Sequence, residues 1–129
     1  MNEENARETI LALERKALDR WCKGDPFGLS DMAADDVSYF DHLTESRVDG
    51  IAALKQHLRQ YEGKVNVPRF EMPNATLRLH DNTAVLAFNW HTYSEDATQT
   101  SRWNATEVYF RIDNQWKLVH SHWSRSQSG

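Results

Sequence analysis

The chain has 129 residues, a formal net charge of −4 and 40% hydrophobic residues, so we expect one domain over residues 1–129 with one core. Its 15 Lys and Arg residues are scattered and form no basic stripe, which argues against nucleic acid as a partner. The single cysteine allows no disulfide within the chain, and neither a signal pattern nor a membrane-spanning apolar run is present, so a cytoplasmic location is expected.

Helical periodicity comes first along the chain. Apolar residues recur at three- and four-residue steps in Glu3–Lys23 and in Gly50–Tyr61, which predicts two amphipathic helices. The helix breakers Gly24-Asp25-Pro26 end the first, and a shorter helix is expected at Phe27–Ala33. Cys22, late in the first helix, is expected to be an unreactive buried thiol.

Strand patterns occupy most of the remaining chain. Val37–Asp41 is typical of a short strand, and His42–Asp49 is a polar loop. Pro68–His80 predicts a strand in which Pro73 indicates an edge position or a bulge, and Thr83–Tyr93 predicts a long strand. Helices followed by a strand meander predict an α+β fold whose sheet curves around the helices.

The last quarter of the chain has the pattern of an antiparallel hairpin. In Thr100–Arg125, aromatic and β-branched residues alternate with polar ones on both sides of Asp113-Asn114-Gln115. On the second strand, one phase of the alternation contains Val119, Ser121 and Trp123. Both phases carry aromatic residues, so one face should cover the core and the other should need a partner surface.

The hairpin also contains the pattern T-x-V-[WY]-x-R-x-D-x-x-W-x-x-V-H-x-H-x-S. The residues that form it are Thr106, Val108, Tyr109, Arg111, Asp113, Trp116, Val119, His120, His122 and Ser124. With Gly24-Asp25 and Asn74 upstream, it resembles the association (hub) domain of calcium/calmodulin-dependent protein kinase. The order of elements resembles the wider nuclear transport factor 2-like superfamily, which includes SnoaL-like polyketide cyclases and steroid isomerases.

The resemblance implies a cone-shaped, cystatin-like roll with a pocket between the curved sheet and the N-terminal helices. It also implies which strand residues face the pocket, namely Asn89, His91, Glu107, Tyr109 and Trp123. The residues that it directs outwards, and that we expect in a subunit interface, are Phe88, Trp90, Val108, Phe110, His120 and His122. Hub pockets carry arginines at places similar to Asn89, Glu107 and Trp123, so the hub's preference for a carboxylate ligand is not carried over.

Asp41 is the first candidate for chemistry. It closes the strand Val37–Asp41, with Gly50 nine residues later, which is similar to the steroid-isomerase pattern whose aspartate is the general base. A partly desolvated carboxylate there would have a raised pKa and could move a proton. The other donors of that enzyme are missing, because their places are similar to Ala17 and Val108 here. The alternative is an aspartate that caps its own turn.

Glu107 and His91 form the second candidate, as a pair able to exchange protons near neutral pH. The alternative is a satisfied buried polar network that holds the cone in shape. The residues expected to line the ligand pocket are Trp21, Tyr39, Asn89, Trp103, Tyr109 and Trp123.

His120 and His122 share one strand face and could both reach a metal ion. No third ligand accompanies them in a recognisable spacing, so we expect an interface role and no metal site.

Two functions remain open. The first is a small-molecule pocket for an apolar or aromatic ligand, with cofactor-free acid–base chemistry of the isomerase, cyclase or dehydratase kind. The second is a non-catalytic association module that forms a homodimer or a larger even-numbered oligomer. Whether the protein is an enzyme is left open by the sequence.

Overall fold

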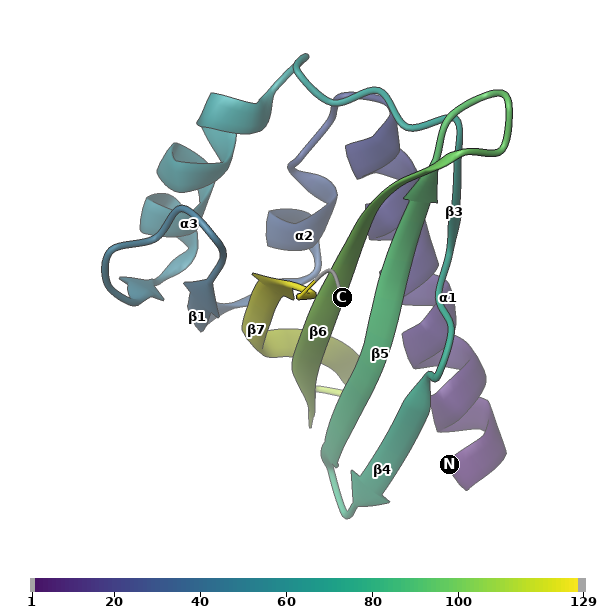
Figure 1. Ribbon diagram of the computed structural model, residues 1–129. Coiled ribbons are helices and arrows are strands. Elements are labelled where there is room, and N and C mark those ends of the chain that lie inside the picture. Colours follow the sequence, from purple (N-terminus) through teal and green to yellow (C-terminus); the bar gives the residue numbers. More distant parts are fainter. Residues whose placement is uncertain (1, 128–129) are drawn as a thin grey trace.

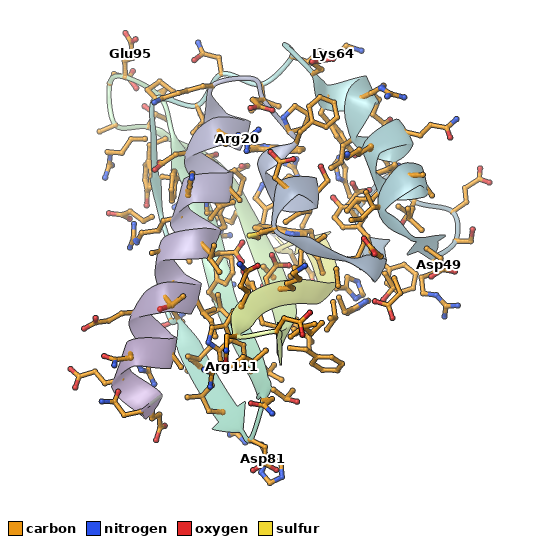
Figure 2. The ribbon with its side chains drawn as sticks, turned by 180° about the vertical axis from the view of Figure 1, so that it is seen from behind. Arg20, Asp49, Lys64, Asp81, Glu95 and Arg111 are labelled. Atoms are coloured by element: carbon orange, nitrogen blue, oxygen red, sulfur yellow. The ribbon has the colours of Figure 1, made fainter. Side chains whose placement is uncertain are left out.

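The computed structural model describes residues 2–127, in which helices lead into a seven-stranded sheet. The first half contains α1 (Glu3–Cys22), α2 (Gly28–Asp31), β1 (Ala33–Phe40), β2 (Val48–Asp49), α3 (Ile51–Leu58) and the 3₁₀ helix η1 (Arg59–Tyr61). The second half contains β3 (Arg69–Glu71), β4 (Thr76–His80), β5 (Thr83–Tyr93), β6 (Gln99–Ile112) and β7 (Gln115–Arg125). Figures 1 and 2 show the helices on one face of the sheet, which confirms the predicted α+β fold.

The strand order is β2-β1-β7-β6-β5-β3, with β4 also paired to β5. All pairs are antiparallel except β1 with β7, which run parallel. The parallel pair brings the end of β1, and Asp41 just after it, next to the second half of β7. The sheet is therefore mixed, and its three long strands, β7, β6 and β5, lie next to one another in its middle (Figure 1).

α1 forms because its apolar residues repeat on one face and its first turn is capped. The Asn2 side chain accepts a hydrogen bond from the backbone N–H of Asn5 at 2.8 Å. The buried face of the helix consists of Ala6, Ile10, Glu14, Ala17, Leu18 and Cys22. Gly24, whose φ of +92° suits glycine, ends the helix. Glu14 is the one charged residue on this buried face, and it becomes important below.

The predicted strand over residues 68–80 is divided into β3 and β4. Asn74 separates the two with a φ of +59°, and both strands pair with the same edge of β5. The carbonyl of Pro73 accepts a hydrogen bond from Asn89 N–H at 3.0 Å, so the interruption stays attached to β5. The predicted loop before α3 also differs, because Val48–Asp49 pairs with β1 as the short strand β2.

The β6–β7 hairpin turns at Asp113 and Asn114, whose φ values of +51° and +65° give the twist that a two-residue turn requires. A bulge interrupts β7 at Val119, because Tyr109 pairs with Leu118 while Val108 pairs with His120. Leu118 and Ser121 consequently both point inwards, and the regular alternation predicted for Val119 ends at this residue.

The side chains of β5 have the opposite orientation to that implied by the resemblance. Phe88 and Trp90 are each 4% exposed and face the helices, so their predicted outward position is wrong. The strand pairing explains this orientation, because Trp90 lies opposite Trp103 and Phe88 lies opposite Ala105. The even-numbered residues of β5 therefore share the inner face with the odd-numbered residues of β6. Asn89 and His91 therefore point to the outer face, contrary to the prediction.

Candidate functional site: an aromatic cavity with two carboxyl groups

A cavity of about 70 Å³ lies between the helices and the inner face of the sheet. It has room for a small ligand or for on the order of five water molecules. The residues that line it are Glu14, Ala17, Leu18, Trp21, Pro26, Leu29, Tyr39, Asp41, His42, Tyr61, Trp90, Trp103 and Trp123. Aromatic rings thus form most of the wall, and two carboxyl groups from different elements interrupt it.

The structure brings four of the expected pocket residues to this wall, namely Trp21, Tyr39, Trp103 and Trp123. Tyr109 is fully buried on the same inner face of the sheet, where its hydroxyl contacts Glu14. Asn89 lies outside the cavity, where its side-chain amide donates to the Oδ1 of Asn104 at 2.8 Å.

Asp41 sits at the cavity wall with a side chain that is only 4% exposed. Its Oδ2 accepts hydrogen bonds from the hydroxyls of Tyr39 and Tyr61, each at 2.8 Å, and from His57 Nε2 at 2.8 Å. Its Oδ1 accepts the backbone N–H of Leu43 at 2.8 Å, which is the turn-capping role considered as the alternative. The carboxylate therefore both caps its turn and ties β1, α3 and η1 together.

The tautomer of His57 follows from its second contact. Gln60 Nε2 can only donate, and it lies 3.1 Å from His57 Nδ1, so that nitrogen accepts. The ring proton then resides on Nε2 and is donated to Asp41. Asp41 is thus held by three side-chain donors, none of which needs to carry a positive charge.

The pKa of Asp41 is lowered, contrary to the raised value predicted. Burial alone would raise this pKa, but the hydrogen bonds from His57, Leu43, Tyr39 and Tyr61 favour the charged form and outweigh burial. An aspartate stabilised in this way is a weak proton acceptor at neutral pH. Its predicted role as general base is consequently less suited to the geometry than a role as a fixed negative charge.

A second carboxyl pair, Glu14 of α1 and Glu107 of β6, lies fully buried beside the cavity. Tyr109 donates to Glu14 Oε1 at 2.5 Å, and Ser121 donates to Glu107 Oε1. The two carboxyl groups also lie within hydrogen-bonding reach of each other, and the Oε2 atom of each has no partner in the geometry of residues 2–127. A hydrogen bond between two carboxyl groups requires that at least one of them is protonated.

Burial raises the pKa of Glu107 well above its usual value, and the neighbouring Glu14 raises it further. Burial also raises the pKa of Glu14, although its hydrogen bonds to Glu107 and Tyr109 oppose the change. Glu107 is therefore the more readily protonated member of the pair and can donate a hydrogen bond to Glu14. Glu14 is the member of the pair that reaches the cavity wall.

The family model of the SnoaL-like domain matches residues 10–127, which is most of the chain. The chain belongs to the SnoaL-like domain family. No curated protein matches the sequence.

Solved structures support the same fold for this SnoaL-like domain. A protein of Parabacteroides distasonis, provisionally named a ketosteroid isomerase, is 32% identical with a TM-score of 0.79 over 92% of this chain and 86% of its own. A nuclear transport factor 2-like protein of unknown function from Pseudomonas putida KT2440 is 24% identical with a TM-score of 0.83, over 98% and 90%. The association domain of C. elegans CaMKII is 17% identical with a TM-score of 0.75, over 95% and 97%. The last two, at this identity, show the fold alone.

Several residues of the SnoaL-like cavity were missed by sequence reasoning. Glu14 carried a readable signal, because it falls four residues after Ile10 and four before Leu18 on the apolar face of α1. His57 and Tyr61 are four residues apart, a spacing that places both on one side of a helix. Both side chains reach Asp41 only because α3 packs against β1, and local sequence patterns do not predict this packing.

The predicted Glu107–His91 pair does not form. His91 lies opposite Arg102 on the outer face, and its Nδ1 is 3.5 Å from Gln99 Nε2. The acidic partner of Glu107 is Glu14 instead. Proton transfer at the cavity would therefore involve two carboxyl groups and no imidazole from β5.

The outer face of the sheet holds the remaining expected interface residues. Phe110 is 43% exposed, and His122 and Val108 are on the same face. His120 Nδ1 is 2.7 Å from the hydroxyl of Ser38, and Phe40 packs against both histidines. Within residues 2–127, no group of three or more His, Cys, Asp or Glu side chains is arranged to hold a metal ion, and no helix is long and apolar enough to cross a membrane.

Proposed function

We propose that this SnoaL-like domain binds a small apolar or aromatic molecule in the cavity and transfers a proton on it without a cofactor. The observation that carries the proposal is the presence of two carboxyl groups, from Glu14 and Asp41, in the wall of one aromatic cavity. Isomerisation, cyclisation and dehydration are reactions that such a site could perform by moving protons alone.

The environments of the two carboxyl groups support different roles. Hydrogen bonds keep Asp41 ionised, whereas burial and a shared proton keep the Glu14–Glu107 pair partly protonated. Titratable groups whose environments drive their pKa values apart are how one site supplies an acid and a fixed charge at the same pH. We assign proton transfer to Glu14, with Glu107 as its proton reservoir, and electrostatic positioning to Asp41.

A thermal-shift screen with hydroxylated polycyclic aromatics, sterols and aryl carboxylates tests ligand binding, because a ligand raises the melting temperature by mass action. A hit should stabilise the wild-type protein and fail to stabilise Trp103→Ala, which removes part of the cavity wall. Phe110→Ala is the matched control, since this aromatic ring lies on the outer face. A panel without any hit, or a hit that persists in Trp103→Ala, would contradict the proposal.

A second function, association of identical subunits through the outer sheet face, rests on a separate observation. Val85 and Phe110 are 36% and 43% exposed and lie with Val108 on neighbouring strands of that face, so they form an apolar patch that a partner could cover. Association-domain proteins are among the solved structures with this fold. Two-fold pairing is the commonest way to bury such a surface.

Light scattering at micromolar concentration tests the association. The wild-type mass should be that of an even-numbered oligomer, and Phe110→Glu should reduce it to the monomer. Leu43→Glu, which places the same charge at an exposed loop residue, should leave the mass unchanged. Burial and the neighbouring His122 lower the pKa of His120, so association should weaken as acid charges this ring. A monomeric wild-type protein at neutral pH would exclude this function.

A further inference from the structure

We propose that the ligand of the cavity is a small organic cation, a protonated amine or quaternary ammonium group on an apolar or aromatic body. The inference rests on the proposed function in one respect, that the cavity is a binding site. It goes beyond that function by specifying the charge of the ligand, which the arrangement of lining residues determines.

The first argument is the charge of the wall. Asp41, whose hydrogen bonds favour the charged form, contributes a negative charge, and Glu14 places a second carboxyl group in the same wall. Among the described lining residues there is no Lys or Arg, and His42 is the one side chain able to become positive. The cavity is therefore negative, and its apolar surroundings make that charge act strongly on anything that enters.

The second argument is that nearby basic groups do not neutralise this charge. Arg20, near the end of α1 (Figure 2), is bound to Asp25 at 2.8 Å and to Asp31 of α2 at 2.7 Å. The Nε2 of His57 donates a hydrogen bond to Asp41. The other ring nitrogen, Nδ1, accepts a hydrogen bond from Gln60. The carboxyl groups are thus bound by hydroxyl, imidazole and backbone donors, and no Lys or Arg is among their described hydrogen-bond partners.

The third argument is the arrangement of rings. Trp90 and Trp123 meet at 81° with centroids 5.7 Å apart, and Trp21 meets Tyr61 at 54° with centroids 4.9 Å apart. Rings set at steep angles around a space offer π-faces from several directions, which is how aromatic cages bind ammonium groups. Trp103 shows that a ring of the wall can hold a cation, because the guanidinium of Arg125 lies 4.9 Å from its ring centroid. Arg125 is exposed and is not among the residues that line the cavity.

Other ligand charges fit this wall less well. An anion would face two carboxyl groups without a cation to receive it, which is unfavourable in a site of low polarity. A neutral ligand could use the rings but would leave the negative charge uncompensated. A cation uses both features at once, since the carboxylates and the ring faces attract the same charge.

Calorimetric titration of the full chain at pH 7 tests the proposal with three ligands that share a phenyl ring and differ in charge. These are phenethylamine, 2-phenylethanol and 3-phenylpropanoate. We expect the amine to bind at least about tenfold more tightly than the alcohol, and the carboxylate to bind more weakly than both. This comparison uses wild-type protein, so it does not depend on whether a variant folds.

Charge-removing variants then locate the effect. Glu14→Gln and Asp41→Asn should each weaken amine binding by about tenfold or more and leave alcohol binding within about twofold. Glu95→Gln, at the tip of the β5–β6 loop (Figure 2), removes an exposed charge and should change neither. Amine binding should also release protons from the Glu14–Glu107 pair, which titrations in buffers of different ionisation enthalpy measure.

The outcomes separate the two proposals. If the alcohol or the carboxylate binds as tightly as the amine, the cation inference is wrong and the cavity remains a ligand site. If amine binding is unchanged in both Glu14→Gln and Asp41→Asn, the cation inference is also wrong. If none of the three ligands binds, the proposed ligand site fails together with the inference.

Discussion

Replacing Glu107 with glutamine tests whether the buried carboxyl pair holds a proton in the folded protein. Glutamine has nearly the shape of a protonated glutamate. Its amide can donate to Glu14, and its carbonyl oxygen can accept from Ser121, as the native side chain does. The substitution therefore keeps the contacts and removes only the titration of this position.

The magnitude follows from proton linkage. A group whose pKa is raised by folding stabilises the protein fully below its unfolded pKa, and this contribution is lost as the pH rises toward the folded pKa. Above the ordinary glutamate value of 4.5, the wild-type protein should thus lose stability. The loss is about 1.4 kcal/mol per pH unit for one extra proton, or about 3 kcal/mol between pH 5 and pH 7.

Urea denaturation of the wild-type protein and Glu107→Gln at pH 5, 6 and 7 measures this difference. The two free energies of unfolding should be similar at pH 5, and the variant should be more stable by about 3 kcal/mol at pH 7. Glu95→Gln, an exposed substitution with the same charge change, should follow the wild-type curve. Parallel curves for wild type and Glu107→Gln would refute the shared proton.

Three further substitutions or modifications have defined outcomes. Tyr61→Phe removes one donor to Asp41 and should lower the free energy of unfolding by about 1–2 kcal/mol at pH 7, as measured by urea denaturation. Because the hydrogen bond favours the ionised form of Asp41, this difference should vanish as acid protonates the carboxylate. A difference that does not change with pH would contradict the network. Gly28→Ala should destabilise the protein by about 1–3 kcal/mol in the same assay, since a Cβ atom would lie 3.0 Å from Ala17 Cα. An unchanged free energy of unfolding would show that α1 and α2 separate easily. Burial raises the pKa of Cys22 to about 12, so iodoacetamide at pH 8 should alkylate the native thiol at least about 100-fold more slowly than the unfolded one, and equal rates would show an exposed thiol.

The helices and long strands were predictable from sequence because they depend on local periodicity. α1, α3 with η1, and the β6–β7 hairpin lie within a few residues of their predicted ranges. The shorter elements were less regular, because β2 has two residues and α2 has four, and such segments are stabilised by their neighbours.

The orientation of β5 shows why the site was harder to predict. Its own pattern places Leu86, Phe88 and Trp90 on one face and Asn89 and His91 on the other, which agrees with the structure. The family resemblance implied the opposite orientation, with Asn89 and His91 facing the pocket, and the prediction for this strand followed the resemblance. Residues of the strand itself were the better guide, since alternation within one strand does not depend on the length of a distant loop.

Contacts between distant elements could not be predicted from local patterns. Asp41 was identified, but its partners come from α3 and η1, and their hydrogen bonds reverse the expected direction of its pKa shift. Glu107 was identified with the wrong partner, because the position of α1 over the sheet brings Glu14 to it. Both errors concern which side chains meet, which depends on the packing of helices on the sheet.

The bulge in β7 gives one residue control over the composition of the cavity wall. Val119 is the extra residue that lets Leu118 and Ser121 both face inwards. If Val119 were kept but the strand paired regularly, without the bulge, the two faces of the strand would be exchanged beyond this point. His120 and His122 would then enter the interior, and Trp123 would turn to the outside. A one-residue shift of the pairing here, with the sequence unchanged, would thus replace an acidic, aromatic cavity wall by one lined by imidazoles.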